Sequence, residues 1–264
     1  MAVQPEGTPC WADAMFPDLE AAKAFYGELF GWTFGESEVE YGDYTQAYVD
    51  GKAVAAISPQ MPGMENVPAS WNLYFATPDA EATAARIREN GGTLMADPMI
   101  IGDFGTNVTA QDPEGMYFSA WQADNHEGFE KTGEPGAYAW VDLMSREVEK
   151  TDAFFPAVFP FQVRRMDVDD IDFRLWSVGD EPVAGRMKMT EGDFPDDVPP
   201  FINVYFAVAD VDDALTTVGK LGGRTVFGPT DSPFGRFATV LDQQGAVFSV
   251  IDLETREGDV PPFI

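Results

Sequence analysis

The sequence is poor in cysteine and histidine, with one of each, Cys10 and His126, among 264 residues. A single cysteine cannot form a disulfide within the chain, so nothing indicates an oxidising compartment, and we expect a cytoplasmic protein. The same scarcity excludes any site built within one chain from several His or Cys ligands. His126 lies in a polar stretch, and we expect its side chain to be solvated.

Basic residues are also scarce, because 16 Lys and Arg face 45 Asp and Glu, for a net charge of −29. Such a surface repels phosphate backbones and anionic lipid headgroups, so we expect neither nucleic-acid nor membrane partners. The sequence also lacks a run of about 18 apolar residues and the basic and apolar regions of a signal peptide. What it has is a hydrophobic content of 45% and 21 phenylalanines, which suffice for packed cores.

The two halves of the chain repeat one another at an offset of about 130 residues. Trp11-Ala-Asp-Ala-Met15 is echoed by Trp140-Val-Asp-Leu-Met144, and Asn72-Leu-Tyr-Phe-Ala76 by Asn203-Val-Tyr-Phe-Ala207. The spacing predicts a duplicated domain, with domain 1 at residues 1–124, a linker at 125–135 and domain 2 at 136–264. A second repeat is unexplained by this plan: the segment 198–202, Val-Pro-Pro-Phe-Ile, recurs at 260–264.

Each half divides again into two strand–helix–strand–strand–strand modules. A strand over 10–16 precedes a helix over 19–30, which Asp18 caps and Gly31 ends, and strands follow at 32–36, 44–50 and 53–58. The plan restarts with a strand over 71–77 and a helix over 79–90. The pattern predicts an α+β fold of four βαβββ modules.

This plan, with the motifs at 18–32 (Asp-Leu-Glu-Ala-Ala-Lys-Ala-Phe-Tyr-Gly-Glu-Leu-Phe-Gly-Trp) and 112–118 (Asp-Pro-Glu-Gly-Met-Tyr-Phe), resembles the vicinal oxygen chelate superfamily. That superfamily comprises glyoxalase I, bleomycin resistance proteins and extradiol dioxygenases. The chain also resembles the tandem glyoxalase-like group found in actinobacteria and often labelled "hydroxylase". The resemblance covers nearly the whole chain. It implies two tandem glyoxalase-like half-barrel domains, each with its strands curled around a cavity.

The resemblance also implies where metal ligands would lie. The positions on the first, fifth and eighth strands hold Trp11, Asn72 and Ser119 in one half, and the fourth-strand segment 53–57 has no carboxylate or His. In the other half the same positions hold Trp140, Asn203 and Ser249, and 183–187 is equally empty of such donors. These side chains do not supply the carboxylate or imidazole donors of a divalent ion, so we expect no metal and no other cofactor.

Other roles for these inward positions remain open. Trp11 and Trp140 are either flat walls for an aromatic ligand or core side chains. Asp13 and Asp142, on the same face, are either acid–base groups with a raised pKa or structural acceptors. The candidate ligand-binding residues are Trp11, Asn72, Tyr74, Tyr117, Ser119, Trp121, Trp140, Asn203, Tyr205 and Ser249. Because Tyr117 and Trp121 flank Ser119, we favour the first half if only one half binds.

These patterns favour a metal-independent binder of a hydrophobic, aromatic small molecule. It would sequester the molecule or act as an accessory in a natural-product pathway, as a monomer or homodimer. One alternative is a superfamily enzyme, such as a lyase, isomerase or hydroxylase/oxygenase-like catalyst, that uses an inward Asp as acid or base. The other is a degenerate scaffold whose cavities are filled by its own side chains.

Overall fold

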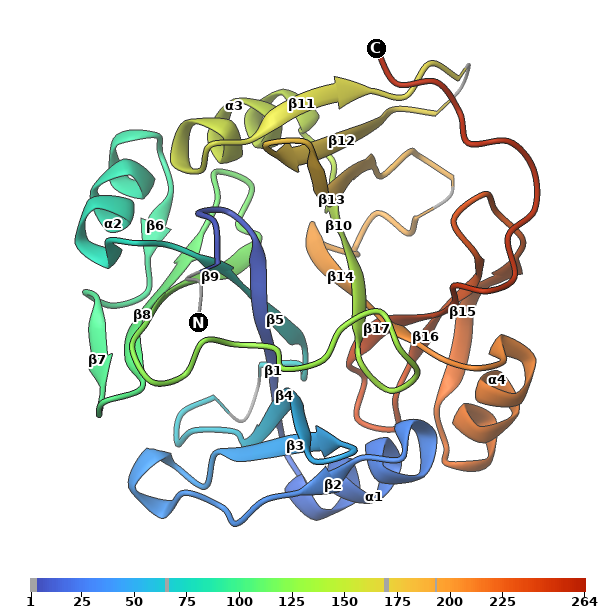
Figure 1. Cartoon of the computed structure of the whole chain (residues 1–264), viewed down its shortest axis with the longest axis horizontal. Coiled ribbons are helices and arrows are strands. Elements are labelled where there is room, and N and C mark those ends of the chain that lie inside the picture. Colours follow the sequence, from blue (N-terminus) through green and yellow to red (C-terminus); the bar gives the residue numbers. More distant parts are fainter. Residues whose placement is uncertain (1–3, 65–66, 169–170, 193) are drawn as a thin grey trace.

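Two mixed β-sheets, one from each half of the chain, stand side by side with the helices at the periphery (Figure 1). The computed structural model describes residues 4–64, 67–168, 171–192 and 194–264. Within these ranges the longest helix has 12 residues, and no helix is long and apolar enough to cross a membrane.

The first half contains two modules. The first is β1 (Pro9–Phe16), α1 (Leu19–Phe30), β2 (Thr33–Phe34), β3 (Thr45–Val49) and β4 (Lys52–Pro59), with a 3-10 turn at Val39–Tyr41. The second is β5 (Trp71–Ala76), α2 (Ala80–Glu89), β6 (Thr93–Leu94), β7 (Met99–Ile101), β8 (Gly105–Gln111) and β9 (Tyr117–Ala123). The strand order is β2-β3-β4-β1-β5-β9-β8-β6, and the short β7 pairs with β8.

The second half repeats this order as β11-β12-β13-β10-β14-β17-β16-β15. Its modules are β10 (Tyr138–Ser145), α3 (Val148–Val158), β11 (Gln162–Arg165), β12 (Phe173–Val178) and β13 (Glu181–Lys188), then β14 (Phe201–Ala207), α4 (Val211–Lys220), β15 (Arg224–Thr230), β16 (Arg236–Leu241) and β17 (Val247–Asp252). The predicted α+β fold of four βαβββ modules is confirmed, and β7 is the one strand that the pattern did not include.

The first helix illustrates why the sequence folds in this way. The side chain of Asp18 accepts the Ala21 N–H at the start of α1, and Gly31 ends the helix at φ 70°, a conformation that glycine adopts without strain. Between these ends, the apolar stripe that includes Phe25 and Tyr26 is buried. The cap, the stripe and the terminating glycine all lie where the sequence predicts them.

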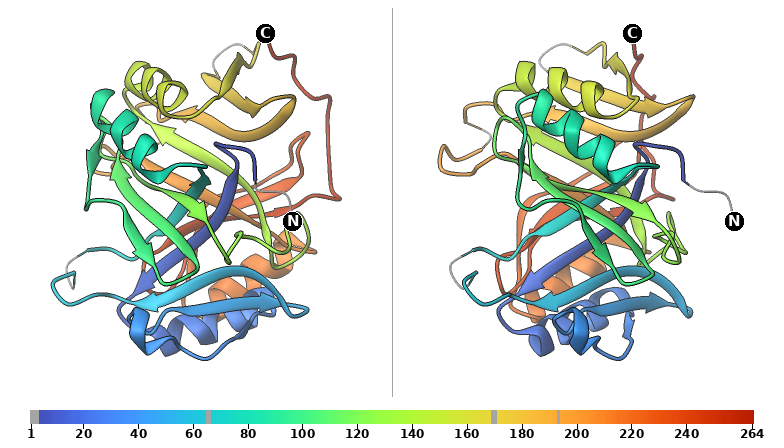
Figure 2. Two further views of the ribbon diagram at one scale, coloured as in Figure 1. Left: turned by 60° about the vertical axis from the view of Figure 1, so that its left-hand side comes forward. Right: turned by 90° about the vertical axis from the view of Figure 1, so that its left-hand side faces the viewer.

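The halves share one core, because the helices of one half lie beside those of the other: α1 beside α4, and α2 beside α3 (Figures 1 and 2). The rings of Phe75 and Phe159, from different halves, are 5.1 Å apart. A Cβ at Gly92 would lie 2.8 Å from the Phe154 ring of the other half, and a Cβ at Gly223 would lie 3.3 Å from the Phe25 ring of the other half. The glycine after each second-module helix therefore permits the close approach of the two layers.

Side chains of the tight turns before β9 and β17 form hydrogen bonds with the opposite half. Glu114, in the first turn, accepts hydrogen bonds from Ser145 Oγ (2.6 Å) and Thr151 Oγ1 (2.7 Å) and from two backbone N–H groups at the start of α3. In the other turn, Gln244 Oε1 accepts the Asp18 N–H at 2.8 Å, at the start of α1. Each half thus caps the first helix of the other half.

Candidate ligand-binding sites

The inward face of the first half holds a hydrogen-bonded network around Asp13 on β1. Its carboxylate accepts the hydroxyls of Tyr74 at 2.7 Å and Tyr44 at 3.2 Å, and the amide of Asn72 at 3.3 Å. Asn72 also donates to Ser119 Oγ at 3.0 Å. The network forms because β1 lies beside β5, which lies beside β9, so inward residues of the three strands meet across the sheet.

Burial dominates the electrostatics of this network. It raises the pKa of Asp13 from 3.8 to about 6, although the hydrogen bonds from Tyr74, Asn72 and Tyr44 oppose the shift. Burial and the neighbouring Asp13 charge raise the pKa of both tyrosines well above its ordinary value. With a pKa of about 6, the carboxyl group of Asp13 therefore titrates slightly below neutral pH, while the tyrosines remain hydrogen-bond donors.

The linker between the halves covers this network. Trp11 is only 3% exposed, because the His126 ring packs edge-on against it at 4.5 Å and the Phe129 ring lies at 5.5 Å. Backbone bonds from Phe129 N to Cys10 O and from Glu130 N to Ala53 O hold the linker in place. The expectation of a solvated His126 was wrong: its ring is largely buried, and this burial lowers its pKa.

The second half keeps the centre of the network but changes its surroundings. Asp142 accepts the indole N–H of Trp140 at 2.9 Å and the hydroxyl of Tyr205 at 2.8 Å, and burial raises its pKa. Asn203 donates to Ser249 Oγ at 2.9 Å, as Asn72 does to Ser119. In the first half the indole of Trp11 donates instead to Tyr44, so the two tryptophans are held differently.

An apolar wall in the second half replaces a polar wall of the first. The positions of Tyr44 and Gln46 beside Asp13 are taken by Phe173 and Leu175 beside Asp142. Gly185 makes room for this exchange, since a Cβ there would lie 2.1 Å from Asp142 Oδ1 and 2.5 Å from the Phe173 ring. Because the wall is apolar, the inward face of the second half suits an apolar ligand better than that of the first.

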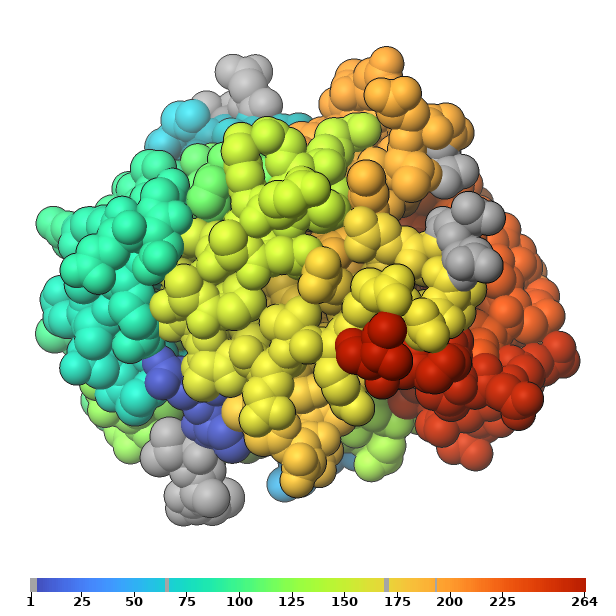
Figure 3. All heavy atoms as spheres, turned by 90° about the horizontal axis from the view of Figure 1, so that it is seen from above, coloured from blue at the N-terminus to red at the C-terminus, as the bar shows by residue number. Residues whose placement is uncertain are grey.

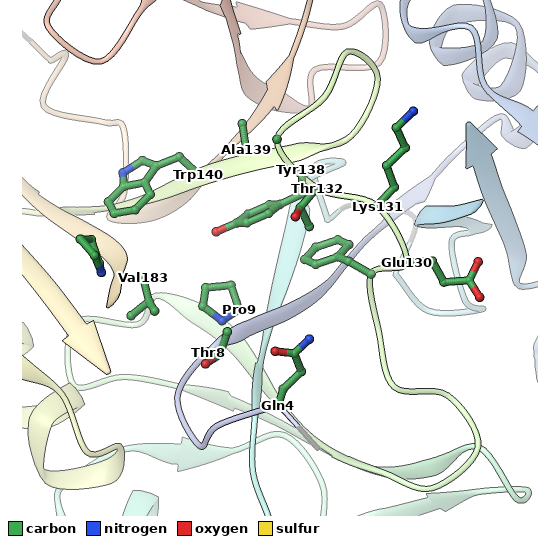
Figure 4. A pocket seen from close by; sticks show the side chains of 13 residues that line it. Gln4, Thr8, Pro9, Glu130, Lys131, Thr132, Tyr138, Ala139, Trp140 and Val183 are labelled. Atoms are coloured by element: carbon green, nitrogen blue, oxygen red, sulfur yellow. The ribbon is translucent and has the colours of Figure 1, made fainter. Parts of the chain in front are cut away.

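A cavity of about 330 Å³ opens where the linker, the chain start and β10 meet. Its aromatic lining consists of Phe129, Tyr138 and Trp140, with Pro9 and Val183 beside them (Figure 4). The rings of Phe129 and Tyr138 stack at 4.7 Å with an interplanar angle of 13°. Trp140 thus lines this cavity and also packs against the apolar wall.

Known proteins match nearly the whole chain. It is 36% identical over 96% of its length to the anthracycline biosynthesis protein DnrV of Streptomyces peucetius, covering 94% of that protein. It is 37% identical over 93% of its length to CFP32 of Mycobacterium tuberculosis, which carries a glyoxylase name, covering 95% of that protein. The model of the Glyoxalase/Bleomycin resistance protein/Dioxygenase superfamily matches residues 11–119. The chain belongs to this superfamily.

A solved structure of the glyoxalase superfamily supports the fold assignment. The Mn(II)-bound glyoxalase of Novosphingobium aromaticivorans aligns with 97% of this chain and 88% of its own, at a TM-score of 0.65 and 16% identity. At that identity the similarity concerns the fold alone. The predicted membership, and the fold it implied, are confirmed.

The metal that the glyoxalase superfamily suggests does not fit these side chains. An indole N–H is a donor only, and Trp11 and Trp140 already direct theirs at Tyr44 and Asp142. Within the described ranges, no group of three or more His, Cys, Asp or Glu side chains could hold a metal ion.

The structure brings most of the candidate residues into these two networks, with two exceptions. Tyr117 is 54% exposed at the start of β9, away from the Asp13 network. Trp121 contacts the ring of Tyr74 edge-on at 6.4 Å but, among the described residues, makes no hydrogen bond to the Asp13 network; its indole N–H donates to the carbonyl of His126 at 2.8 Å. The buried amide oxygens of Asn72 and Asn203 accept no hydrogen bond from the described residues, so they are free acceptors.

Several residues that contact these networks were not among the predicted site residues. Thr109 and Thr239 contact Ser119 and Ser249 at 3.1 and 2.8 Å, and as identical residues at offset 130 they could have been found from the repeat. Phe129 could not, because nothing in the linker's composition predicts that it folds back over β1.

Proposed function

We propose that the protein binds a hydrophobic, aromatic small molecule without a metal ion, at the cavity beside Trp140. The observation that carries this proposal is the gathering of Phe129, Tyr138 and Trp140 around a space of about 330 Å³. The proposal differs from the sequence-based preference for the first half, because the linker buries Trp11 while Trp140 remains partly exposed. In this role the protein sequesters its ligand, or presents it to another enzyme, in the cytoplasm.

The size of the cavity and the aromatic side chains in its lining, which also contains Glu130 and Lys131, support this class of ligand. Small-molecule sites are mostly apolar spaces of about 300–1,000 Å³ with a few polar groups that fix orientation. Here Gln4, Thr8 and Thr132 provide such groups, and Lys131 is held in an ion pair with Asp50 at 2.8 Å. An uncharged ring system fits better than an anion, since the protein carries a net charge of −29.

The names of the relatives point in the same direction. DnrV is named for anthracycline biosynthesis, and anthracyclines contain fused aromatic rings. A ligand of this kind would stack on the indole of Trp140. Stacking of aromatic rings contributes more binding free energy than the burial of their apolar area alone. We therefore extend this class of ligand to the present chain.

Equilibrium dialysis with 2-(hydroxymethyl)anthraquinone, an uncharged three-ring probe, tests the proposal. We expect saturable binding, and a Kd raised about tenfold or more in Trp140→Leu, because the aromatic wall is removed. Tyr117→Leu is the matched control, since Tyr117 is an aromatic side chain that is 54% exposed and does not line the cavity. It is expected to bind the probe as the wild type does.

Two results would contradict the proposal. Equal weakening by Tyr117→Leu and Trp140→Leu would mean that the cavity is not the site. The degenerate scaffold would instead be favoured if the wild-type protein does not bind the probe and a chelator does not change its folding. Circular dichroism of both variants verifies that each is folded before affinities are compared.

A second candidate function is acid–base catalysis by Asp142. The observation favouring it is that a buried carboxylate with a raised pKa lies two residues from Trp140, held by Tyr205 and by that indole. Such a group can take a proton from a weakly acidic carbon of a bound ligand. Proton abstraction is therefore the chemistry this half could perform without a metal.

Anthrone, a three-ring ketone with acidic C10 hydrogens, provides the assay for this second candidate. We expect wild-type protein to accelerate exchange of the C10 hydrogens with D₂O under anaerobic conditions, measured by proton NMR. Asp142→Asn should lose the acceleration while retaining anthrone binding. Unchanged exchange in Asp142→Asn would eliminate Asp142 as a base.

A further inference from the structure

The segment that follows the last strand of each half folds back over that half. In the first half this is the linker, whose Phe129 and His126 lie on Trp11. In the second half it is the C-terminal segment, residues 253–264, which crosses from β17 to the opposite edge of the sheet at β11 (Figures 1 and 3). The recurring Val-Pro-Pro-Phe-Ile sequence forms the end of this segment.

Phe263 lies within the apolar wall that distinguishes the second half. It packs against a cluster of Met166, Phe173 and Leu175, to which Trp140 also belongs. The rings of Phe263 and Phe173 are 6.4 Å apart at an interplanar angle of 60°, a geometry typical of edge-to-face contacts. An aromatic ring of the chain itself therefore occupies the apolar wall against which Trp140, a residue of the cavity lining, also packs.

Backbone hydrogen bonds hold the C-terminal segment at its end and at Glu257, whose N–H donates to the carbonyl of Ser232 at 3.0 Å. The end of the segment makes three backbone hydrogen bonds with the β11 region: Arg165 N to Ile264 O, Ile264 N to Arg165 O, and Asp167 N to Pro262 O, each of 2.8–2.9 Å. The preceding residues 254–260 are exposed. Exposed edge pairing of this kind opens at a small fraction of the cost of global unfolding.

We propose that Phe263 is a built-in occupant of an aromatic subsite formed by Phe173, Leu175 and Trp140, and that the ligand displaces it. This inference rests on the proposed function, and it specifies the part of the ligand that enters: an uncharged aromatic ring without polar substituents at that end. Phe173 and Leu175 replace Tyr44 and Gln46 of the first half, so the subsite offers stacking and apolar contact where the first half offers hydrogen bonds.

Competition between Phe263 and the ligand can be measured directly. Because a half-buried ring must be released before the ligand's ring can bind, Phe263→Ala should bind 2-(hydroxymethyl)anthraquinone about fivefold to tenfold tighter than wild type. Ile264→Ala is the matched control, since Ile264 is 65% exposed, and its affinity should be unchanged. Leu175→Gln restores the polar residue of the first half and should weaken binding about tenfold.

A second measurement follows the segment itself. Hydrogen exchange of the Asp167 and Ile264 amides in wild-type protein should accelerate when the probe is bound, because the pairing with β11 is released. Equal or weaker binding by Phe263→Ala, or slower exchange in the complex, would overturn the displacement. If Trp140→Leu still weakens binding in that case, the proposed function stands and this inference alone fails. Wild-type protein that does not bind the probe overturns both.

Discussion

Replacing Asp13 with asparagine should stabilise the protein, and more so as the pH rises. The folded-state pKa of Asp13 is about 6, whereas its ordinary value is 3.8. The folded protein therefore holds this proton more tightly than the unfolded chain, and ionisation above pH 6 costs stability. The cost is absent below pH 3.8 and grows between the two pKa values.

The magnitude follows from the shift at 1.36 kcal/mol per pKa unit. The charge on Asp13 costs about 3 kcal/mol at pH 8 and about 1.6 kcal/mol at pH 5. Asparagine removes this cost but turns an N–H toward one of the donors from Tyr44, Tyr74 or Asn72, a loss of about 1 kcal/mol at either pH. The net gain is about 2 kcal/mol at pH 8 and about 0.6 kcal/mol at pH 5.

Urea unfolding of wild type and Asp13→Asn at both pH values measures these gains. The decisive quantity is the difference between the two gains, about 1.4 kcal/mol, because the lost hydrogen bond contributes equally at both. Asp97→Asn, at a position whose side chain is 91% exposed, is the control and should change stability by less than about 0.5 kcal/mol. A gain that is independent of pH would refute the reasoning about Asp13.

Substitutions at three further positions test the packing and the hydrogen bonds of the structure. Tyr26→Phe removes the hydroxyl that donates to Asp242 at 2.9 Å and accepts from Trp71 at 3.1 Å, and should destabilise by about 2–3 kcal/mol in urea unfolding; no loss would mean that water replaces it. Glu114→Ala should lower the free energy of unfolding by about 2 kcal/mol, and Glu114→Gln should lower it less, because Gln244 caps the equivalent helix with a glutamine. Equal losses in the two variants would contradict the capping argument. Gly185→Ala should raise the Kd for the anthraquinone probe and lower the thermal midpoint, since a Cβ would meet Asp142 and Phe173; an unchanged Kd would separate this position from the site.

The sequence predicted the elements well because their signals are local. The cap at Asp18, the stripe through Phe25 and the terminating Gly31 act within one helix, and the structure confirms that helix at Leu19–Phe30. The repeat extended each such assignment to a second place in the chain. It also located Asp13 with Asn72, and Asp142 with Tyr205, on the same inward faces.

The linker and the C-terminal segment cover the two halves through long-range contacts, and local sequence patterns do not predict such contacts. His126 stands in a polar stretch, yet its ring is largely covered because the linker forms hydrogen bonds with Cys10 and Ala53. Ala53 is more than 70 residues away along the chain. Phe263 lies about 90 residues from Phe173 along the chain and contacts it only because the C-terminal segment pairs with β11. Alternation along a strand predicts which face a side chain occupies, but not which distant segment covers that face.

The exchange of helix caps between the halves has a consequence for how the two sites can differ. Glu114 and Gln244 each stabilise a helix of the opposite half, so the halves are arranged like two subunits of a symmetric dimer that happen to be joined. In a dimer of identical subunits, any change to one inward face would appear on both. Joining two unequal halves allows one face to present tyrosine hydroxyls under the linker, while the other presents phenylalanine and leucine under the C-terminal segment.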